Sequence, residues 1–488
     1  MASRKNPTPT PTPTAIAPEP GRASAHSTRG SSSRASTRSP RLAAARATAP
    51  AAARRTRQRL DLVLFGATGY TGRQAVRALL EQRPDAHWGV AARDGQRLQA
   101  LVDELVPAAA RAPRLIVADA YDAASLSAMA AQTRVLINLA GPYHASGDAV
   151  VAACIGAGTH YLDLSGETFW LQRLVRQQHD AASDAGVKII PCAGYEALPF
   201  DLATLWAAHQ LRDHAGEACA GVTIAMRLTG APLRHPRDAL SGGTAATVTE
   251  LLAHDHSGCI GDMACLLPPG ARGAKAVAER NALGWLPRYD ARLRAVLGPA
   301  LPGPFINPPV VLRGVALLDD ATLFSPRFRY REGTDMRSVL PGAQLLPQRA
   351  SLALQWAGAA ALAAPLAQLR ATLAGPLQFQ RGLLGAWLRR VSPRPGSGPR
   401  AAALEAIGYE LEVLARGVRG ARFRGLVSAD GHPGYRSTPR MVVCAGLGLA
   451  DGSLGRTPHC GIVPPAAALG IEAVAALGAA GVGFKPAA

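Results

Sequence analysis

Three glycines spaced three residues apart, directly after an apolar run, constrain the fold of this chain more than any other feature. The apolar run is Leu60–Phe65, and the segment Gly66–Gly72 that follows reads Gly-Ala-Thr-Gly-Tyr-Thr-Gly. An amphipathic stretch then begins at Arg73. A strand that turns into a helix through such glycines is typical of a parallel sheet that binds a dinucleotide, whereas the spacing without that context would be a weak signal.

Each glycine of this loop has a separate expected role. Gly66 permits a tight turn off the strand, and Gly69 lets backbone amides approach a pyrophosphate. Gly72 lets the helix pack closely on the sheet, so that the free N–H groups of the helix N-terminus face the phosphates. We therefore expect the whole loop to bind the cofactor, through Gly66, Ala67, Thr68, Gly69, Tyr70, Thr71 and Gly72.

Short apolar runs alternate with amphipathic stretches as far as residue 195, which is the pattern of a doubly wound parallel sheet. We predict strands at Leu60–Phe65, Trp88–Ala92, Leu115–Ala118, Val135–Leu139, Tyr161–Leu164 and Lys188–Pro191. The helices between them are predicted at Arg73–Glu81, Gln96–Leu105, Ala124–Gln132, Asp148–Ala157 and Phe169–Ala185. This pattern indicates an α/β fold with a Rossmann-type dinucleotide-binding domain over residues 59–200.

The sequence after residue 200 is less regular and indicates a second, mixed α/β (α+β) domain over residues 201–425. Helices are predicted at Asp201–Leu211 and Thr244–Ala253, and strands at Gly221–Thr229 and Tyr409–Ala415. Residues 393–400 are typical of a linker. The C-terminal segment, residues 426–488, contains a final amphipathic helix at Pro464–Gly478 that begins with two prolines.

Leu352–Leu384 is a long apolar stretch within the second domain. It is rich in alanine and is interrupted at Gln355, Pro365, Gln368 and Arg370. A transmembrane helix needs about 20 uninterrupted apolar residues, and alanine contributes little to insertion. We therefore favour a helical hairpin, either buried in the domain or resting on a membrane surface, over a membrane span.

Residues 1–58 differ from the rest of the chain in composition. They contain a Pro-Thr repeat and many Ser, Arg and Ala residues, so they cannot offset the entropy that ordering costs, and we expect a disordered tail. The tail holds eleven Lys or Arg residues and one Glu, and it therefore carries +10 of the formal net charge of +19. The charge of the remaining residues is modest, and we expect no nucleic-acid partner.

The seven cysteines are scattered, odd in number, and include no Cys-x-x-Cys pair, which is not the pattern of a disulfide framework. We therefore expect a cytoplasmic protein, in contact with the inner face of the plasma membrane if the apolar stretch rests there. His254, His256, Cys259 and Cys265 lie close together in the sequence, but their spacing matches no common zinc site. We expect no metal.

The ends of the second and third predicted strands bear on the choice of nucleotide. A site that prefers NAD usually places Asp or Glu at the end of the second strand. Here the strand leads into Arg93, which together with Arg97 offers guanidinium groups suited to a 2′-phosphate, so we expect NADPH. The alternative is that Asp94 caps the next helix while both arginines face solvent. Asp119, after the third strand, either accepts from the adenine amino group or caps the following turn.

Ligands of such sheets lie beyond the carboxyl ends of the strands, so the segment after the fourth strand is expected to line the nicotinamide half of the cofactor. Its cofactor-binding candidates are Asn138, Ala140, Gly141 and Pro142.

At these residues the sequence resembles the saccharopine dehydrogenase-like oxidoreductases, in particular the branch of trans-acting enoyl reductases. The resemblance covers about residues 59–485, and its segments occur in one order along the chain. They are Gly66–Gly72, Ala91–Asp94, Gly141–Tyr143 with Gly147, Gly158–Glu167, Cys192–Pro199, Ser241–Thr244, Gly434-Tyr435 and Pro464–Gly470.

The resemblance implies an NADP-binding domain, a second domain that completes the active site, a C-terminal segment that returns to the first domain, and reduction of a lipid-like acyl substrate. Two departures bear on the substrate. Tyr195-Glu196-Ala197 stands where the family usually has Phe-Asp-Ser, and the apolar stretch of the second domain is unusually rich in alanine.

A reductase takes hydride from NADPH and usually needs a general acid. Tyr143 is the first candidate, because it follows the strand end expected near the nicotinamide; the alternative is a tyrosine packed between the domains. Tyr195 and Glu167 are further catalytic candidates. The same cleft is expected to contain His144, Asp163 and Glu196. A structural role is the alternative for each, and Glu167 in particular is placed to cap the helix that begins near Phe169.

Three functions follow from these observations. The leading one is an NADPH-dependent reductase of a hydrophobic acyl or polyketide-derived chain. The second is a saccharopine-type amino-acid dehydrogenase, for which Arg327, Arg329 and Arg331 would bind substrate carboxylates, although their alternate spacing also fits an exposed strand face. The third is a catalytically idle NADPH-binding protein that senses redox state or scaffolds partners.

Overall fold

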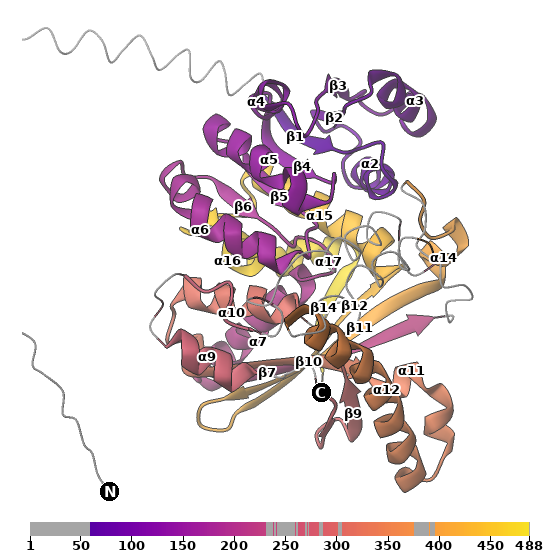
Figure 1. The fold of residues 1–488 in the computed structure, drawn as a ribbon, viewed down its shortest axis with the longest axis vertical. Helices are drawn as coiled ribbons and strands as arrows, with labels where there is room; N and C mark the ends of the chain where they lie inside the picture. Colours follow the sequence, from indigo (N-terminus) through magenta and orange to yellow (C-terminus); the bar gives the residue numbers. More distant parts are fainter. Residues whose placement is uncertain are drawn as a thin grey trace, which may run out of the picture. The chain divides into compact units, whose positions relative to one another are not determined.

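The computed structural model describes residues 59–230, 262–268, 273–282, 286–300, 305–374 and 396–487, with single residues between these ranges. Figure 1 shows two sheets with helices around them. The expected tail (residues 1–58), the predicted helix at 244–253 and the end of the apolar stretch (375–384) lie outside the described residues.

The first sheet is the predicted doubly wound one. Its strands are β1 (Leu60–Phe65), β2 (Trp88–Ala92), β3 (Arg114–Val117), β4 (Thr133–Asn138), β5 (His160–Asp163), β6 (Lys188–Ile190) and β13 (Gly461–Ile462). Their order is β13-β6-β5-β4-β1-β2-β3, and every pair is parallel. The order reverses between β1 and β4, which is where sheets of this kind bind ligands. The six predicted strands are confirmed to within two residues at each end.

The helices between these strands are α2 (Tyr70–Gln82), α3 (Gly95–Leu105), α4 (Ala123–Ala130), α5 (Tyr143–Ala157) and α6 (Thr168–Asp184). The prediction for α5 was wrong at its start, since this helix begins five residues before Asp148. The reason is a contact from outside the helix. The carboxylate of Glu167 accepts hydrogen bonds from the backbone N–H groups of Tyr143 and His144, which are the first two residues of α5.

The second sheet is mixed. Its strands are β7 (Cys219–Gly230), β8 (Arg288–Asp290), β9 (Ala295–Gly298), β10 (Phe324–Asp335), β11 (Ile407–Gly417), β12 (Arg422–Asp430) and β14 (Val482–Pro486). They lie in the order β14-β12-β11-β7-β10-β9-β8. The pair β7–β10 is parallel and the other pairs are antiparallel. The mixed second fold unit expected from the sequence is therefore present.

Helix α7 (Leu198–Ala215) joins the two sheets, since it follows the first sheet along the chain and packs on β7, β11 and β12 of the second. Its residues 198–208 are all buried, which explains why its apolar pattern is not that of an amphipathic helix. One apolar core includes Leu62 and Ile137 of the first sheet, Phe200 of α7, and Ile224 and Tyr409 of the second sheet.

The remaining helices pack around both sheets, and one of them, α15, lies against β1 and β4 in the middle of the first sheet. They are α9 (Ala274–Asn281), α10 (Asn307–Leu318), α11 (Met336–Val339), α12 (Gln348–Ala374), α14 (Ala401–Ala406), α15 (Thr438–Asp451), α16 (Pro465–Leu469) and α17 (Glu472–Ala479). The described residues also contain a 3-10 turn, η2 (Pro341–Leu345), and a π-helical turn, η4 (Pro433–Ser437). The single helix predicted at Pro464–Gly478 is in fact two, because Gly470 adopts a φ of +81° that ends α16.

The apolar stretch of the second domain forms α12, which continues without interruption from Gln348 to Ala374. Gln355 and Pro365 interrupt the apolar pattern but do not end the helix, so the predicted helical hairpin does not turn at either residue. Gln355 is buried, and its side-chain oxygen accepts a hydrogen bond from the N–H of Val296 on β9, so this polar residue fastens the helix to a strand. Among the described residues, Gln348–Gln368 is long and apolar enough to cross a membrane by length and composition, and only 17% of that window is buried.

Candidate active site

The loop between β1 and α2 has the geometry that its glycines predicted. Gly66 has a φ of +82°, and a Cβ there would lie 2.8 Å from the backbone nitrogen of Ala140. A Cβ at Gly72 would lie 2.3 Å from the carbonyl oxygen of Gly66. Both distances are far below van der Waals contact, so the turn and the close approach of α2 to β1 each require glycine.

The N-terminus of α2 is free to bind an anion. Gly69 is the N-cap residue, and no side chain caps the helix. The first N–H groups of a helix have no intrahelical acceptor and carry the positive end of the helix dipole, so they suit a pyrophosphate. A cradle that two missing Cβ atoms keep open, beside an uncapped helix of thirteen residues, fits a dinucleotide.

The side chain of Tyr70 points away from the cofactor loop and contacts residues from the C-terminal half of the chain. Its hydroxyl donates to the carbonyl oxygen of Pro399, and its ring meets that of Tyr435 edge-on at 5.5 Å. Burial raises the pKa of Tyr70 to about 12. Within the loop, this side chain therefore anchors the backbone and leaves the backbone N–H groups to the cofactor.

After β2, the sequence left two alternatives: arginines that bind a 2′-phosphate, or an aspartate that caps the next helix. The structure has the cap and also leaves Arg93 exposed. Asp94 caps α3 by accepting from the N–H groups of Gln96 and Arg97, and its carboxylate lies 3.3 Å from the guanidinium of Arg97. Arg93 is exposed and has no ion-pair partner among the described residues. Arg93 is therefore the arginine without a competing carboxylate, and recognition of a 2′-phosphate by Arg93 and Arg97 stays a prediction.

Asp119 and Asn138 both shape loops with their side chains. A carboxylate oxygen of Asp119 accepts from the N–H of Tyr121 at 3.0 Å, which caps the turn after β3. Asn138 is fully buried; it donates to the hydroxyl of Tyr161 at 3.1 Å and accepts from the N–H of Ala140 at 3.0 Å. Asn138 therefore fixes the course of the segment from Leu139 to Pro142, of which Gly141 is exposed at the end of β4.

Tyr143 uses both hydrogen-bonding capacities of its hydroxyl within the protein. The hydroxyl donates to the carbonyl oxygen of Asn138 at 3.2 Å and accepts from the N–H of Leu164 at 3.3 Å. The ring stacks on Trp170 at 5.8 Å, and the side chain is 7% exposed. Burial raises the pKa of Tyr143 well above its ordinary value. This arrangement favours a structural role that ties the ends of β4 and β5 together.

Glu167 is also committed to the fold. It is 1% exposed, and its two oxygens accept from the N–H of Tyr143 at 3.0 Å and from the N–H of His144 at 2.7 Å. The imidazole Nδ1 of His144 lies 2.7 Å from the same carboxylate. Glu167 therefore caps α5, whereas the sequence pointed to α6 as the helix it would cap.

Asp163 joins the ends of β5 and β6. Its carboxylate accepts from the hydroxyls of Tyr161 and Ser165 and from the N–H groups of Ser165 and Cys192. Burial raises its pKa to about 6, although each of these bonds acts in the opposite direction. Tyr161 and Asp163 share one face of β5, as their alternate spacing predicts.

Tyr195 is the catalytic candidate whose hydroxyl remains available. Its backbone N–H donates to the hydroxyl of Thr438, and its ring packs edge-on against Tyr409 at 4.8 Å. The side chain is 6% exposed, and among the described residues its hydroxyl has no hydrogen-bond partner. Burial raises the pKa of Tyr195 well above its ordinary value, so the hydroxyl holds its proton.

Glu332 and Asn307 are site residues that sequence reasoning missed. Glu332 lies on β10 and is 4% exposed. One of its oxygens accepts from the hydroxyl of Tyr330 at 2.7 Å and from the side-chain amide of Asn307 at 3.1 Å. The other oxygen of Glu332 and the side-chain oxygen of Asn307 have no partner among the described residues. Burial raises the pKa of Glu332 to about 8, so this carboxyl group is mostly protonated at neutral pH.

Tyr195, Asn307 and Glu332, which we call the acid cluster, adjoin the carboxyl ends of β5 and β6. The charge of Glu332 raises the pKa of Tyr195, and a Cβ at Gly166, after β5, would lie 2.9 Å from Ile306. Buried polar atoms are nearly always hydrogen-bonded, so three unpartnered ones in one region indicate a place for a polar group of a ligand. Two proton donors and one acceptor are available there.

A signal for Glu332 was present in the sequence. Phe328, Tyr330 and Glu332 alternate along β10 and are all buried, while the arginines between them are exposed. A carboxyl group at an inward position of an alternating strand is therefore a candidate for a perturbed pKa.

Comparison with known proteins agrees with this geometry. The model of the saccharopine dehydrogenase NADP binding domain matches residues 62–190. A Mycobacterium tuberculosis protein named as a trans-acting enoyl reductase is 33% identical over 444 residues, which cover 88% of this chain and 98% of that protein. The chain belongs to the trans-acting enoyl reductase family. Trans-acting enoyl reductases of Mycobacterium bovis and Mycobacterium ulcerans are each 31% identical, over 86% of this chain and 96% of their own length.

A solved structure, apo saccharopine dehydrogenase (L-Glu forming) from Saccharomyces cerevisiae, is 16% identical, covers 88% of this chain and 99% of its own, and gives a TM-score of 0.42. This chain, as a member of the trans-acting enoyl reductase family, is an NAD(P)-dependent oxidoreductase. The family of its first domain identifies the cofactor as NADP(H). The resemblance stated from the sequence is confirmed.

The arginines and the potential metal ligands considered in the sequence analysis are not part of the acid cluster. Arg327, Arg329 and Arg331 are on the exposed face of β10. His254 and His256 lie outside the described residues. Within the part of the chain that the structure describes, no group of three His, Cys, Asp or Glu residues is arranged to hold a metal ion.

Proposed function

We propose that this protein is an NADPH-dependent reductase that saturates a carbon–carbon double bond of a lipid-like acyl substrate. The observation that carries the proposal is the buried carboxyl group of Glu332, one oxygen of which has no partner among the described residues, in the acid cluster beside the ends of β5 and β6. The names of the relatives, which are enoyl reductases, support an acyl substrate.

The proposed reaction adds a hydride and a proton across the double bond. NADPH, when bound on the loop between β1 and α2, supplies the hydride and becomes NADP⁺. The proton goes to the carbon next to the carbonyl group, where negative charge develops, or to the carbonyl oxygen on the way there. Glu332 and Tyr195 both hold a proton at neutral pH and have an unpartnered oxygen to present to the substrate.

The surroundings of the acid cluster suit an apolar chain better than a charged amino acid. Tyr195 packs against Phe200 and Tyr409, and its hydroxyl is buried. A saccharopine-type dehydrogenase would need cations that converge on substrate carboxylates. Arg327, Arg329 and Arg331 instead point to the exposed face of their strand, so we rank that function second.

The decisive experiment offers purified protein and NADPH an enoyl thioester of medium chain length, and in parallel the amino-acid substrates of saccharopine dehydrogenases. Loss of NADPH absorbance is followed together with the mass of the product. We expect a product two mass units heavier from the enoyl thioester only. Turnover of the amino acids alone would replace the proposal, and tight NADPH binding without turnover of either would leave a sensor or scaffold.

The proposal places the enzyme in the cytoplasm, at the inner face of the plasma membrane. The seven cysteines are all free, which fits a reducing compartment. Fractionation of cells that produce the protein, followed by detection in the soluble and membrane fractions, tests this location.

A further inference from the structure

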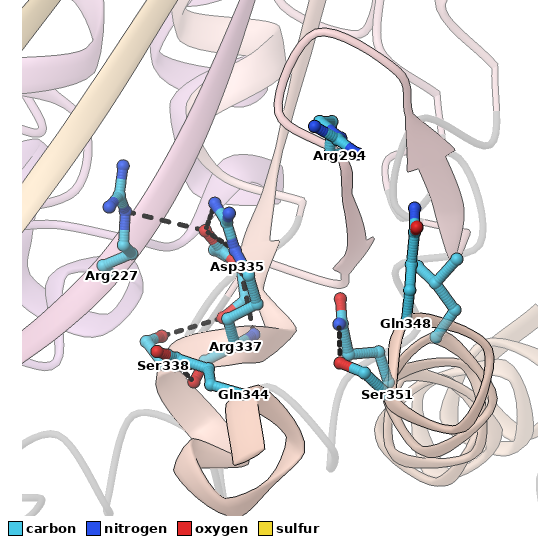
Figure 2. Close-up of a pocket in the computed structure, with 10 residues that line it drawn as sticks. Arg227, Arg294, Asp335, Arg337, Ser338, Gln344, Gln348 and Ser351 are labelled. Carbon is cyan, nitrogen blue, oxygen red and sulfur yellow. Dashed lines mark hydrogen bonds and ion pairs between the residues drawn. The ribbon is translucent and has the colours of Figure 1, made fainter. Parts of the chain in front are cut away.

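A cavity lies beside the end of β10, between the second sheet and the start of α12. Its volume is about 410 Å³. It is formed by β7, the turn before β9, the end of β10 and the first turns of α12, and Figure 2 shows the side chains that line it. Most of these side chains are basic or polar: Arg227, Arg294, Arg337, Ser338, Gln348 and Ser351.

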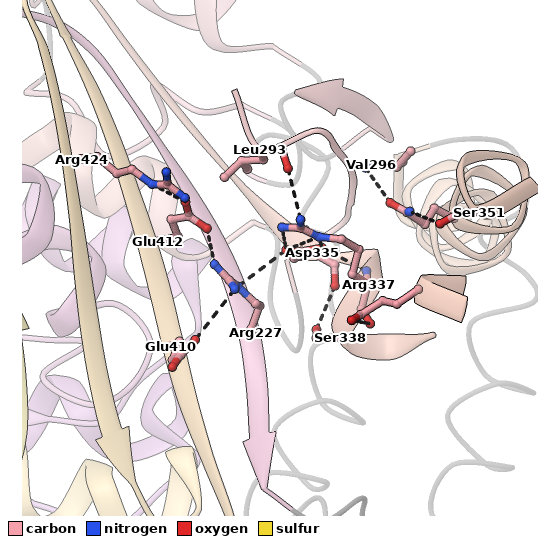
Figure 3. A network of polar contacts seen from close by, with 12 residues as sticks. Arg227, Leu293, Val296, Asp335, Arg337, Ser338, Ser351, Glu410, Glu412 and Arg424 are labelled. Carbon is pink, nitrogen blue, oxygen red and sulfur yellow. Dashed lines mark hydrogen bonds and ion pairs between the residues drawn. The ribbon is translucent and has the colours of Figure 1, made fainter. Parts of the chain in front are cut away.

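Two of the three arginines of this cavity belong to an ion-pair network. Asp335 is fully buried and pairs with Arg337 at 2.6 Å and with Arg227 at 3.6 Å (Figure 3). Arg227 also pairs with Glu412, which Arg424 binds from the other side. These pairs fix the position of the arginines, so that little side-chain entropy would be lost when an anion binds.

Arg294 supplies the charge that this network does not neutralise. It lies in the turn before β9 and is exposed, and it has no ion-pair or hydrogen-bond partner among the described residues. In Figure 2 it stands on a separate loop across from Arg337 and Gln348. The cavity therefore has a free cation and several neutral donors, which together suit a phosphate group.

Large exposed apolar side chains gather next to this cavity. Of the exposed large hydrophobic residues, Val339, Leu345, Leu346, Leu354 and Trp356 all fall within the turn and helix that follow Arg337. On its other side, α12 is fastened to β9 through Gln355, and Ala359 is buried there. Trp356 and Leu354 on α12, and Leu345 and Leu346 just before this helix, are thus exposed to solvent, and a soluble protein rarely exposes such a group of apolar side chains without a partner.

The charge of the surrounding sequence indicates the kind of partner. Within the described part of this surface, residues 336–368 contain Arg337 and Arg349 and no Asp or Glu, and Arg294 adds a third arginine. A second copy of the chain on this surface would bring two such arginine sets together, which like-charge repulsion disfavours. An anionic bilayer has the complementary charge, an interface in which tryptophan is favoured, and an apolar layer for the leucines.

We propose that the cavity and the outward side of α12 form a docking site for an anionic phospholipid membrane. A headgroup phosphate occupies the cavity beside Arg294 and Arg337, and Trp356 and Leu354 enter the interfacial layer. Because one side of α12 is fixed on the second sheet, the helix lies on the bilayer and does not cross it.

Vesicle sedimentation with the full chain tests the docking site. The vesicles are phosphatidylcholine alone, or equal parts of phosphatidylcholine and phosphatidylglycerol. We expect binding to the anionic vesicles that weakens with added salt, and binding about fivefold weaker for Arg294→Gln, since one arginine near an anionic surface contributes about 1 kcal/mol. Trp356→Ala should weaken binding as well.

Matched controls separate this site from other basic or aromatic surfaces. Arg329→Gln removes an exposed arginine on β10, and Tyr121→Ala removes an aromatic side chain that is 76% exposed beside the first sheet; neither should change binding. The basic residues 1–58 are present in every variant, so differences among variants report the cavity and α12.

Three results would overturn the proposal. The first is equal binding to both kinds of vesicle. The second is wild-type binding by Arg294→Gln and Trp356→Ala. The third is a change of mass in solution without lipid when Trp356 is replaced, because this would show that a second copy covers the surface.

Discussion

The cofactor loop and the acid cluster differ in the physical basis of ligand binding. At the cofactor end, the loop between β1 and α2 leaves room, because Gly66 and Gly72 lack the Cβ atoms that would fill it. At the acid cluster, buried side chains present unpartnered polar atoms, and burial keeps a carboxyl group and a phenol protonated. Binding at the loop therefore depends on steric fit to the backbone. The acid cluster depends on electrostatics, because the exclusion of water raises the pKa values of its groups.

The comparison teaches that binding and chemistry can be lost separately. A change at the acid cluster removes a proton donor without touching the loop. A change in the loop removes the cofactor without altering the pKa of Glu332. The following predictions test this separation.

Glu332→Gln should give the largest effect. Glutamine keeps the shape and the neutral charge but has no acidic proton, so turnover should fall about 1000-fold, within the range of general-acid catalysis. The affinity for NADPH, measured by fluorescence titration, should not change. Glu279→Gln, an exposed position on α9, is the control. A Glu332→Gln enzyme with normal turnover would exclude the carboxyl group as the acid.

Gly72→Ala should disturb the cofactor loop and leave the acid cluster intact. The new Cβ would lie 2.3 Å from the oxygen of Gly66, so α2 must move away from β1. We expect a loss of about 3 kcal/mol in the free energy of unfolding, as in other overpacked sites, and weaker NADPH binding. Gly156→Ala in α5 is the matched control, because a Cβ there meets nothing within 4 Å, and alanine should slightly stabilise that helix. Urea denaturation and NADPH titration of both variants distinguish the two sites.

The pH dependence of kcat/KM should report the acid cluster. The pKa of Glu332 is raised to about 8, so the active, protonated form is lost above this value and kcat/KM should fall about tenfold by one pH unit beyond it. The unfolded chain releases this proton near the ordinary pKa of 4.5, while the folded protein retains it. Stability should therefore decrease as the pH rises from that value toward 8, and Glu332→Gln should remove this part of the slope.

Arg93→Ala should give the smallest effect of the four. Arg93 is exposed, so its pair with a 2′-phosphate is worth only about 1 kcal/mol, or about fivefold in the preference for NADPH over NADH. Titration with both nucleotides measures this preference. If it is unchanged in the variant, another group recognises the 2′-phosphate.

The first sheet and the cofactor loop could be predicted from the sequence because their determinants are local. Each apolar run is a buried strand, and the glycine spacing encodes the turn that follows it. The acid cluster could not be predicted in the same way, since Tyr195, Asn307 and Glu332 come from three separate segments that meet only in the folded chain.

The failures of prediction have the same cause. The first turn of α5 depends on the carboxylate of Glu167, which lies 23 and 24 residues further along the chain. The continuity of α12 depends on the bond between Gln355 and Val296 of β9. A polar residue that looks like an interruption in a sequence becomes a fastening when a distant strand supplies its partner.

The two short strands near the end of the sequence have a consequence for biosynthesis. β13 completes one edge of the first sheet beside β6, and β14 completes one edge of the second sheet beside β12. Both strands emerge from the ribosome after all the other described strands. A nascent chain that stops before residue 461 leaves β6 and β12 as edge strands in place of β13 and β14, and the newly exposed edges are templates for aggregation. Early termination should therefore yield insoluble protein, however complete the cofactor loop already is.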